Sequence, residues 1–139
     1  MRSNIIWRVT AGLLIAAIIL SACGPEEVGG FQIPNVEKDM FNVAMVLIGP
    51  HDDGGWSQAH YEGLVYVEEN VPNVHVAYIE NVPEGADSEQ VFRALSRKGF
   101  DLIIGTSYGF MDPMETVAAD YPDIMYVHIS GSESNGTNF

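Results

Sequence analysis

The sequence predicts an α/β fold with a doubly wound parallel sheet, and two observations support this. Short apolar runs alternate with amphipathic segments in the order strand and helix three times, followed by a fourth strand. The first run, 41–48, is almost continuously apolar, which is typical of a strand buried on both faces of a parallel sheet. Such alternation implies right-handed crossovers with helices on both faces of the sheet.

The first strand is ended by Gly49 and Pro50, and Gly54 with Gly55 opens a helix. Along this helix one stripe recurs at spacings of three and four residues, which predicts the face that packs. The stripe is Trp56, Ala59, His60, Gly63 and Val67. A second strand is expected over 74–79.

Ser88 is the expected N-cap of the next helix, with Glu89 in its first turn. Its apolar stripe is Val91, Phe92 and Leu95, and Gly99 ends it. A third strand over 102–104 precedes a third helix over 113–121, and 124–129 is the fourth strand. The third helix has the stripe Met114, Val117, Ala118 and Tyr121.

The first residues have the layout of a secretory signal. Arg2 and Arg8 form a basic start, residues 9–20 carry no charge, and this apolar run is shorter than the ~20 residues of a comfortable membrane span. The run leads into Leu-Ser-Ala-Cys at 20–23, which resembles the bacterial lipobox. Residues 1–22 are therefore predicted to be a lipoprotein signal peptide and Cys23 the lipid-attachment site. The alternative is an uncleaved anchor helix with a buried free cysteine.

Cys23 is the only cysteine, so no internal disulfide can form. Residues 23–39 contain Pro25, Gly29, Gly30 and Pro34 and are predicted to be a flexible tether. Residues 40–139 are predicted to be one α/β lobe. Because such a domain normally continues beyond its last strand, we expect the chain to be a fragment that lacks a second lobe.

The charge balance excludes one class of partner. After loss of Arg2 and Arg8, four of the six basic residues remain against 19 acids, a net charge of −15. Nucleic acid is an unsuitable partner for such a chain, and adhesion to anionic lipid is disfavoured, which leaves the acyl chain as the membrane anchor.

Two loops are expected at the carboxyl ends of strands, where open parallel sheets bind ligands. The first loop is 49–58 and the second is 105–112. Glycines there allow close approach of a ligand, Asp53 can accept hydrogen bonds, and Trp56 offers a flat face for stacking. Purely structural roles are the alternatives: Trp56 as a core anchor, Asp52 and Asp53 as helix caps, and the second-loop residues as caps of the third helix. The candidate ligand-binding residues are Asp53, Gly55, Trp56, Ser57, Ser107, Tyr108 and Asp112.

Catalysis and metal binding find little support. Asp52 and Asp53 are adjacent rather than opposed across a cleft, so they are poor partners for general acid and base chemistry. His51 precedes the helix that carries His60, and the pair lacks the usual ligand spacing. The segment around Gly54 and Gly55 is not a phosphate loop, because it lacks the lysine and the longer glycine pattern of that motif. We therefore expect no enzyme, no metal and no cofactor.

Two motifs resemble the BMP (basic membrane protein) family of ABC-transporter substrate-binding lipoproteins. The first runs from Gly49 to Gly63 and includes Asp-Gly-Gly-Trp-Ser-Gln at 53–58, and the second is Gly-Thr-Ser-Tyr-Gly-Phe-Met-Asp-Pro at 105–113. The resemblance implies a type I periplasmic-binding-protein lobe and a purine nucleoside or nucleobase as ligand. By the same resemblance, Asp53 holds the ligand, Trp56 stacks on the base, and Ser107 with Tyr108 adds contacts.

The sequence departs from the family pattern at two positions. Asp52 stands where asparagine or glycine is common, and Trp56 replaces a phenylalanine of the nucleoside-binding branch. The exact solute is therefore left open.

The leading hypothesis is a solute receptor that serves an ABC permease and its ATPase, lipid-anchored and extracytoplasmic, on the outer face of the cytoplasmic membrane or in the periplasm. The alternative is a membrane-anchored sensor or signalling lipoprotein of the same fold. An extracellular hydrolase would need a nucleophile paired with a general base, and the sequence does not offer such a pair.

Overall fold

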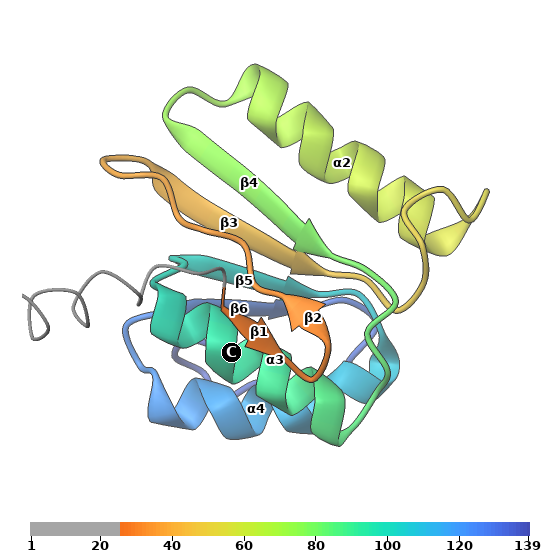
Figure 1. Cartoon of the computed structure of the whole chain (residues 1–139). Helices are drawn as coiled ribbons and strands as arrows, with labels where there is room; N and C mark the ends of the chain where they lie inside the picture. The colour runs from red at the N-terminus through yellow and green to blue at the C-terminus, as the bar shows by residue number, and fades with distance from the viewer. Residues whose placement is uncertain (1–25) are drawn as a thin grey trace, which may run out of the picture.

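A computed structural model describes residues 26–139, which form a four-stranded parallel sheet with helices on both faces and a small hairpin at the start (Figure 1). The predicted signal peptide and Cys23 lie outside the described residues. The elements are β1 Glu27–Val28, β2 Phe31–Gln32, β3 Phe41–Val46, α2 Trp56–Asn70, β4 Val74–Ile79, α3 Ala86–Lys98, β5 Leu102–Gly105, the 3-10 turn η1 Tyr108–Phe110, α4 Met111–Asp120 and β6 Met125–His128.

The sheet has the strand order β4-β3-β5-β6, and every neighbouring pair is parallel. The chain therefore moves outward from β3 to β4 and then crosses to the other side for β5 and β6. This reversal puts the topological switch point between β3 and β5, where open α/β sheets bind ligands. The predicted doubly wound fold is confirmed, and the loops after β3 and β5 lie at that point.

The helices cover the two faces of the sheet unequally. In Figure 1, α2 lies on one side of the sheet while α3 and α4 lie together on the other. The α3 and α4 side holds the main core, in which Phe92, Leu95, Ile103, Phe110 and Met114 are fully buried. Within residues 26–139, none of the helices combines the length and the hydrophobicity that crossing a membrane requires.

On the α2 side the cluster is small, because one helix covers only part of four strands. Leu64 of α2 packs with Val43 and Met45 of β3 and with Leu47, which directly follows that strand. Met125 and Val127 of β6, which alternate with the buried Tyr126, remain 49% and 38% exposed. The outer half of this sheet face is thus an apolar surface without a covering helix in the described part of the chain.

The predicted packing face of α2 is wrong. Its buried residues are Ser57 and Leu64, with Tyr61 partly buried between them, whereas Ala59 and Gly63 of the expected stripe are exposed. Both sets fit helical spacing. Leucine and tyrosine have more apolar surface to bury than alanine and glycine, so the helix turns these larger side chains toward β3 and β4.

Helix α3 begins earlier than predicted. Its N-cap is Gly85, and Ser88 is a buried residue of the first turn whose hydroxyl donates back to the Gly85 carbonyl at 2.8 Å. The remaining expectations for this helix are confirmed. Val91, Phe92 and Leu95 are fully buried, and Gly99 ends the helix in the left-handed conformation at φ 95°, which glycine adopts without steric penalty.

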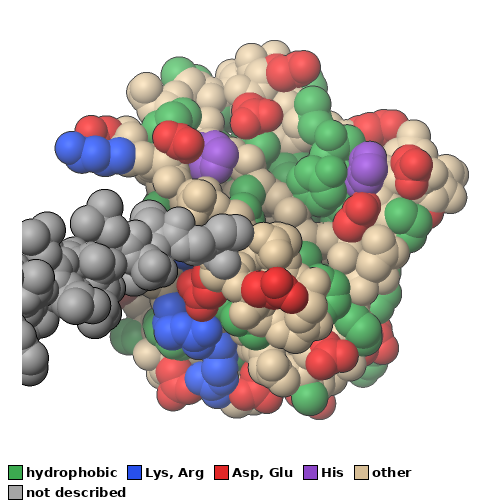
Figure 2. Space-filling view, in the orientation of Figure 1, with side chains coloured by type: hydrophobic (Ala, Val, Ile, Leu, Met, Phe, Trp, Pro, Cys, Tyr) green, Lys and Arg blue, Asp and Glu red, His purple; other side chains and the backbone are tan. Residues whose placement is uncertain are grey.

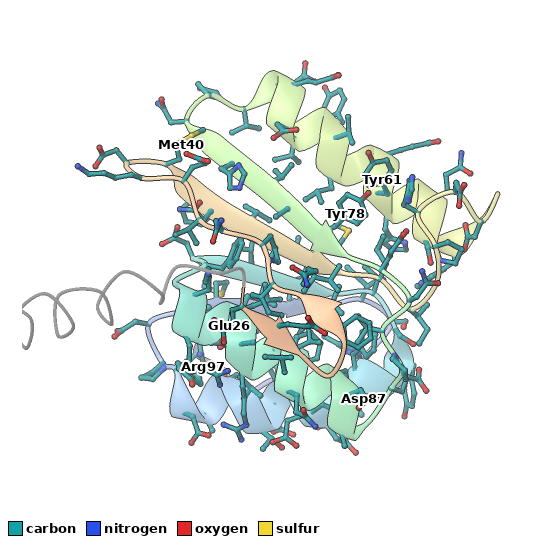
Figure 3. The ribbon with its side chains drawn as sticks, viewed as in Figure 1. Glu26, Met40, Tyr61, Tyr78, Asp87 and Arg97 are labelled. Atoms are coloured by element: carbon teal, nitrogen blue, oxygen red, sulfur yellow. The ribbon has the colours of Figure 1, made fainter. Side chains whose placement is uncertain are left out.

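The predicted tether differs from the structure over much of its length. Residues 27–32 form a hairpin in which Val28 and Phe31 pack against the main core, and Ile33 is buried in it. Arg97 of α3 also bonds Glu26 at 3.2 Å, and Figure 3 shows the two side chains close together. Glycine and proline indicated flexibility, but three apolar residues between them supply enough surface to hold the segment on the domain.

We predict that Phe92→Ala lowers the free energy of unfolding by about 3–5 kcal/mol, because it empties a fully buried site facing Phe110 at 5.6 Å between ring centroids. Tyr66→Ala is the control, since Tyr66 is 65% exposed, and it should change stability by less than about 0.5 kcal/mol. Urea unfolding of both variants measures the difference. Equal losses would contradict the assignment of the main core to the α3 side.

Candidate ligand-binding site

The two candidate loops meet at the carboxyl edge of the sheet. The indole N–H of Trp56, at the start of α2, donates to the carbonyl oxygen of Thr106, directly after β5, at 2.5 Å. Thr106 is itself fixed, because its hydroxyl donates to the Val46 carbonyl at the end of β3 at 3.0 Å and is fully buried. The expected convergence of the loops is therefore present in the structure.

Trp56 is not a core residue, since 47% of its surface is exposed. The His60 ring lies against the indole at 4.5 Å between centroids, and His60 Nδ1 is 2.6 Å from the Trp56 carbonyl. With the N–H bonded to Thr106, the indole is held in one orientation while much of its surface faces solvent. Such an aromatic side chain is suited to stacking on a planar ligand.

Asp53 caps helix α2. Its carboxylate accepts from the backbone N–H groups of Gly55, Ser57 and Gln58 at 2.8, 3.0 and 3.0 Å. These bonds, led by the one from Gln58, lower the pKa of Asp53 below its ordinary value, since they favour the charged form. The capping role considered in the sequence is present, and it leaves part of the carboxylate's acceptor capacity free.

Gly55 and Ser57 serve the same loop in different ways. Gly55 is exposed and donates to Asp53. Ser57 is fully buried, and its Oγ accepts from the Gly49 N–H at 3.2 Å, which fixes the loop against the end of the strand. In this conformation Ser57 shapes the loop and offers no surface to a ligand.

The second loop is anchored from two more elements. The Ser107 hydroxyl donates to Glu84 Oε1 at 2.5 Å, and the Ser107 carbonyl accepts from His128 Nε2 at 2.6 Å. Because Nε2 faces a carbonyl, it carries the hydrogen, and the buried Nδ1 of His128 has no partner within the described residues. Tyr108 is 62% exposed at the start of η1.

Asp112 lies apart from Asp53 and Trp56. It is an exposed residue in the first turn of α4 and lines a pocket of about 470 Å³ between the first turns of α3 and α4. Tyr108 lines the same pocket, whereas none of the first-loop candidates does. The structure thus brings the loop of Asp53 and Trp56 against the loop of Ser107, whereas Asp112 lines a pocket that these three residues do not line.

Sequence reasoning missed Glu80, Glu84 and His128. Glu80 directly follows β4, Glu84 lies in the loop after it, and His128 ends β6. The available signal was position, because polar residues at the ends of neighbouring parallel strands share one edge of the sheet. The prediction used that signal only for the loops after β3 and β5.

Glu80 holds the first loop from the side of β4. Its Oε2 accepts from the backbone N–H of His51 at 2.8 Å and lies 2.7 Å from His51 Nδ1, and these contacts lower the pKa of Glu80. The His51 ring packs edge-on against Tyr61 at 4.9 Å. Tyr78, adjacent to Tyr61 in Figure 3, has a raised pKa, chiefly because of burial and then because of Tyr61 and Glu80.

The ring nitrogens of His51 and His60 contact different partners, and residues 26–139 contain no group of three or more histidine, cysteine, aspartate or glutamate side chains suited to a metal ion. On the face seen in Figure 2, acidic side chains are spread around the surface while basic ones gather in few places.

Comparison with known proteins decides the family. Residues 40–139 match the Bmp family, described as PnrA-like ABC transporter substrate-binding proteins. This chain is a Bmp-family protein. The Bmp family consists of substrate-binding proteins rather than enzymes, in agreement with the sequence prediction.

Two relatives of this Bmp-family chain carry different ligand names. A purine-binding protein of Brucella abortus is 35% identical over 107 residues, which are 75% of this chain and 31% of that protein. A protein of Haloferax volcanii named as an ABC transporter glucose-binding protein is 39% identical over 95 residues, 68% of this chain and 24% of that one. The chain thus spans a third or less of the length of these relatives.

A solved structure supports the fold. The transcriptional activator of the comK gene from Bacillus halodurans superposes on this Bmp-family chain with a TM-score of 0.58 and 27% sequence identity. The superposed residues are 67% of this chain and 31% of the activator.

We predict that the Asp53 cap makes stability depend on pH. The folded-state pKa is lowered, so the cap's contribution is complete above the ordinary aspartate pKa of about 3.9 and is lost as the pH falls through the folded value. The melting temperature of Asp53→Ala should therefore fall below that of the wild type at pH 7, and the gap should narrow as the pH falls below about 4. Asp52→Ala is the matched control, because no hydrogen bond holds the exposed Asp52 carboxylate within the described residues. A gap that stays constant down to pH 3 would argue against the cap.

Proposed function

We propose that this chain provides one lobe of an extracytoplasmic receptor that binds a purine nucleoside or nucleobase and delivers it to an ABC permease and its ATPase. The observation that carries the proposal is Trp56, a half-exposed indole held between the two loops of the switch point. Its position matches the place where parallel α/β sheets bind ligands. The purine-binding relative, 35% identical, supports the ligand class.

The chemistry around Trp56 favours a ligand that is flat and rich in hydrogen-bond donors. Asp53 lies three residues before Trp56, Ser107 directly follows Thr106, and both side chains carry oxygen acceptors. Purine N–H groups and ribose hydroxyls supply the matching donors. A sugar also presents hydroxyls, and the glucose-named relative makes glucose the competing ligand to test.

We assign the candidate residues different roles in this receptor. Trp56 stacks on the ligand, Asp53 and Ser107 accept hydrogen bonds from it, and exposed Tyr108 closes over it. Gly55 lets the ligand approach the backbone, and Ser57 supports the loop from beneath. For Asp112 we propose a peripheral contact. Asp112 and Tyr108 line one pocket, and the other candidate residues do not line it.

We further propose that Cys23 carries the lipid that keeps the receptor beside its permease. The support is the layout of residues 1–23, with a basic start, an apolar run and the sequence Leu-Ser-Ala-Cys. An acyl anchor concentrates the protein at the membrane without requiring a basic surface, which suits a chain with six basic and 19 acidic residues.

A test of the ligand class is calorimetric titration of the protein in its full natural length with adenosine, guanosine, inosine, adenine and glucose. We expect heat with at least one purine. Binding of glucose alone would replace the ligand class, and no heat with any purine would reject it.

We predict that Trp56→Ala weakens the best purine ligand by about 5- to 150-fold, since stacking of a base on an aromatic side chain contributes ~1–3 kcal/mol. Tyr66→Ala, which removes a more exposed aromatic side chain far along α2, should leave affinity unchanged. Unchanged affinity in Trp56→Ala would remove Trp56 from the site.

The lipid anchor predicts a modified N-terminus. Mass spectrometry of protein purified from its native membrane should show a chain that begins at Cys23 and carries a diacylglycerol thioether. Cys23→Ala should abolish the modification, so that the mass of the diacylglycerol is absent from the spectrum. An unmodified chain that retains residues 1–22 would overturn this assignment.

A second function is a ligand sensor, favoured by the structural similarity to a transcriptional activator. A sensor and an import receptor would share the site but differ in consequence. Deletion of the gene should abolish uptake of the bound solute if the protein serves an importer. Normal uptake together with altered transcription would favour the sensor.

A further inference from the structure

Glu84 reaches the ligand loops from an element that the proposed site does not include. It lies in the loop between β4 and α3, and this loop crosses the end of β3 because the Val82 N–H donates to the Leu47 carbonyl at 3.1 Å. Val82 is fully buried there. The crossing brings Glu84 from the edge strand β4 to the loop after β5, two strands away in the sheet.

One carboxylate oxygen of Glu84 binds two groups of that loop. Oε1 accepts from the Ser107 hydroxyl at 2.5 Å and from the Gly109 N–H at 3.1 Å. The first distance lies in the range of charge-assisted O–H···O⁻ bonds, which are about twice as strong as neutral ones. An ionised carboxylate only accepts, so the Ser107 hydrogen points at Glu84.

Gly109 makes this close approach possible. A Cβ built on Gly109 would overlap the carboxyl group of Glu84. Glycine at this position therefore allows the backbone N–H of residue 109 and the Ser107 hydroxyl to share one oxygen.

The direction of the Ser107 hydrogen determines what Ser107 can offer to a ligand. With its hydrogen given to Glu84, the Oγ atom has only lone pairs left, and it can accept but not donate. The backbone that carries this hydroxyl is held by Trp56 through the Thr106 carbonyl and by His128 through the Ser107 carbonyl, which keeps Ser107 within reach of Glu84.

We propose that Glu84 is a positioning residue that fixes Ser107 as a hydrogen-bond acceptor and thereby selects a ligand with an N–H or O–H donor at that point. The inference rests on the proposed function, since it concerns the ligand contact of Ser107. Glu84 acts through Ser107 and does not itself touch the ligand.

Two substitutions at Glu84, measured for ligand affinity and for melting temperature, distinguish a positioning role from an effect of its charge and from a purely structural effect. A long-range effect of the charge would be lost equally in Glu84→Gln and Glu84→Ala. A hydrogen-bond effect would survive largely in Glu84→Gln, because the amide oxygen still accepts from Ser107 and Gly109. A purely structural effect would lower the melting temperature without changing affinity for the ligand.

The experiment is a double-mutant cycle on the protein in its full natural length, titrated with the best-binding member of the panel of purines and glucose. We expect Glu84→Ala to weaken binding by about five- to tenfold, the effect of one net hydrogen bond, and Glu84→Gln by less than about threefold. Ser107→Ala combined with Glu84→Ala should bind no worse than Ser107→Ala alone, because the two act through one contact. Asp87→Ala removes an exposed acid three residues along the chain that does not line the pocket beside Asp112, and it should leave binding unchanged.

Hydrogen exchange of the Gly109 amide tests the contact without ligand, and Glu84→Ala should accelerate it. Additive losses in the double variant, equal losses in the Gln and Ala variants, or an unchanged Gly109 exchange rate would each overturn the inference. Wild-type protein that binds no member of the panel would reject the proposed function instead, and the Gly109 exchange rate would then decide whether Glu84 holds the loop.

Discussion

The parallel pairing of β3 with both β4 and β5 is the constraint on which the site depends. Because β3 is central and its neighbours run in the same direction, the chain segments that leave the three strands emerge at one edge of the sheet. The segment 106–109 then forms hydrogen bonds in three directions: it accepts from Trp56 after β3 and from His128 at the end of β6, and it donates to Glu84 after β4. A reversed or shifted strand would separate these groups.

The sequence was sufficient for the architecture. Continuous apolar runs identify strands such as β3, and the stripes of α3 and α4 identify their buried faces, because these elements pack on both sides or on a broad core. Where an element packs less, the pattern is ambiguous. Helix α2 covers an edge of the sheet, and the stripe that begins at Trp56 fits helical spacing as well as the buried Ser57 and Leu64 do.

The meeting of the two candidate loops was predictable from the sequence, and the contacts between their residues were not. Position after a strand was enough to select Asp53, Trp56 and Ser107. The partners of these residues depend on loop paths that no local pattern encodes, such as the crossing of residues 80–85 over the end of β3. For the same reason the burial of Ser57, the capping by Asp53 and the role of Glu84 follow only from the three-dimensional arrangement.

The uncovered apolar surface of β6, with Met125 and Val127, bears on how the domain behaves in solution. Exposed strand surface favours association of one copy with another. Residues 26–139 carry four basic and 19 acidic side chains, and a net charge of −15 keeps such copies apart by repulsion. At physiological ionic strength, salt screens this repulsion beyond a Debye length of about 8 Å. The acidic side chains therefore protect the isolated domain from association most strongly in a buffer of low salt concentration.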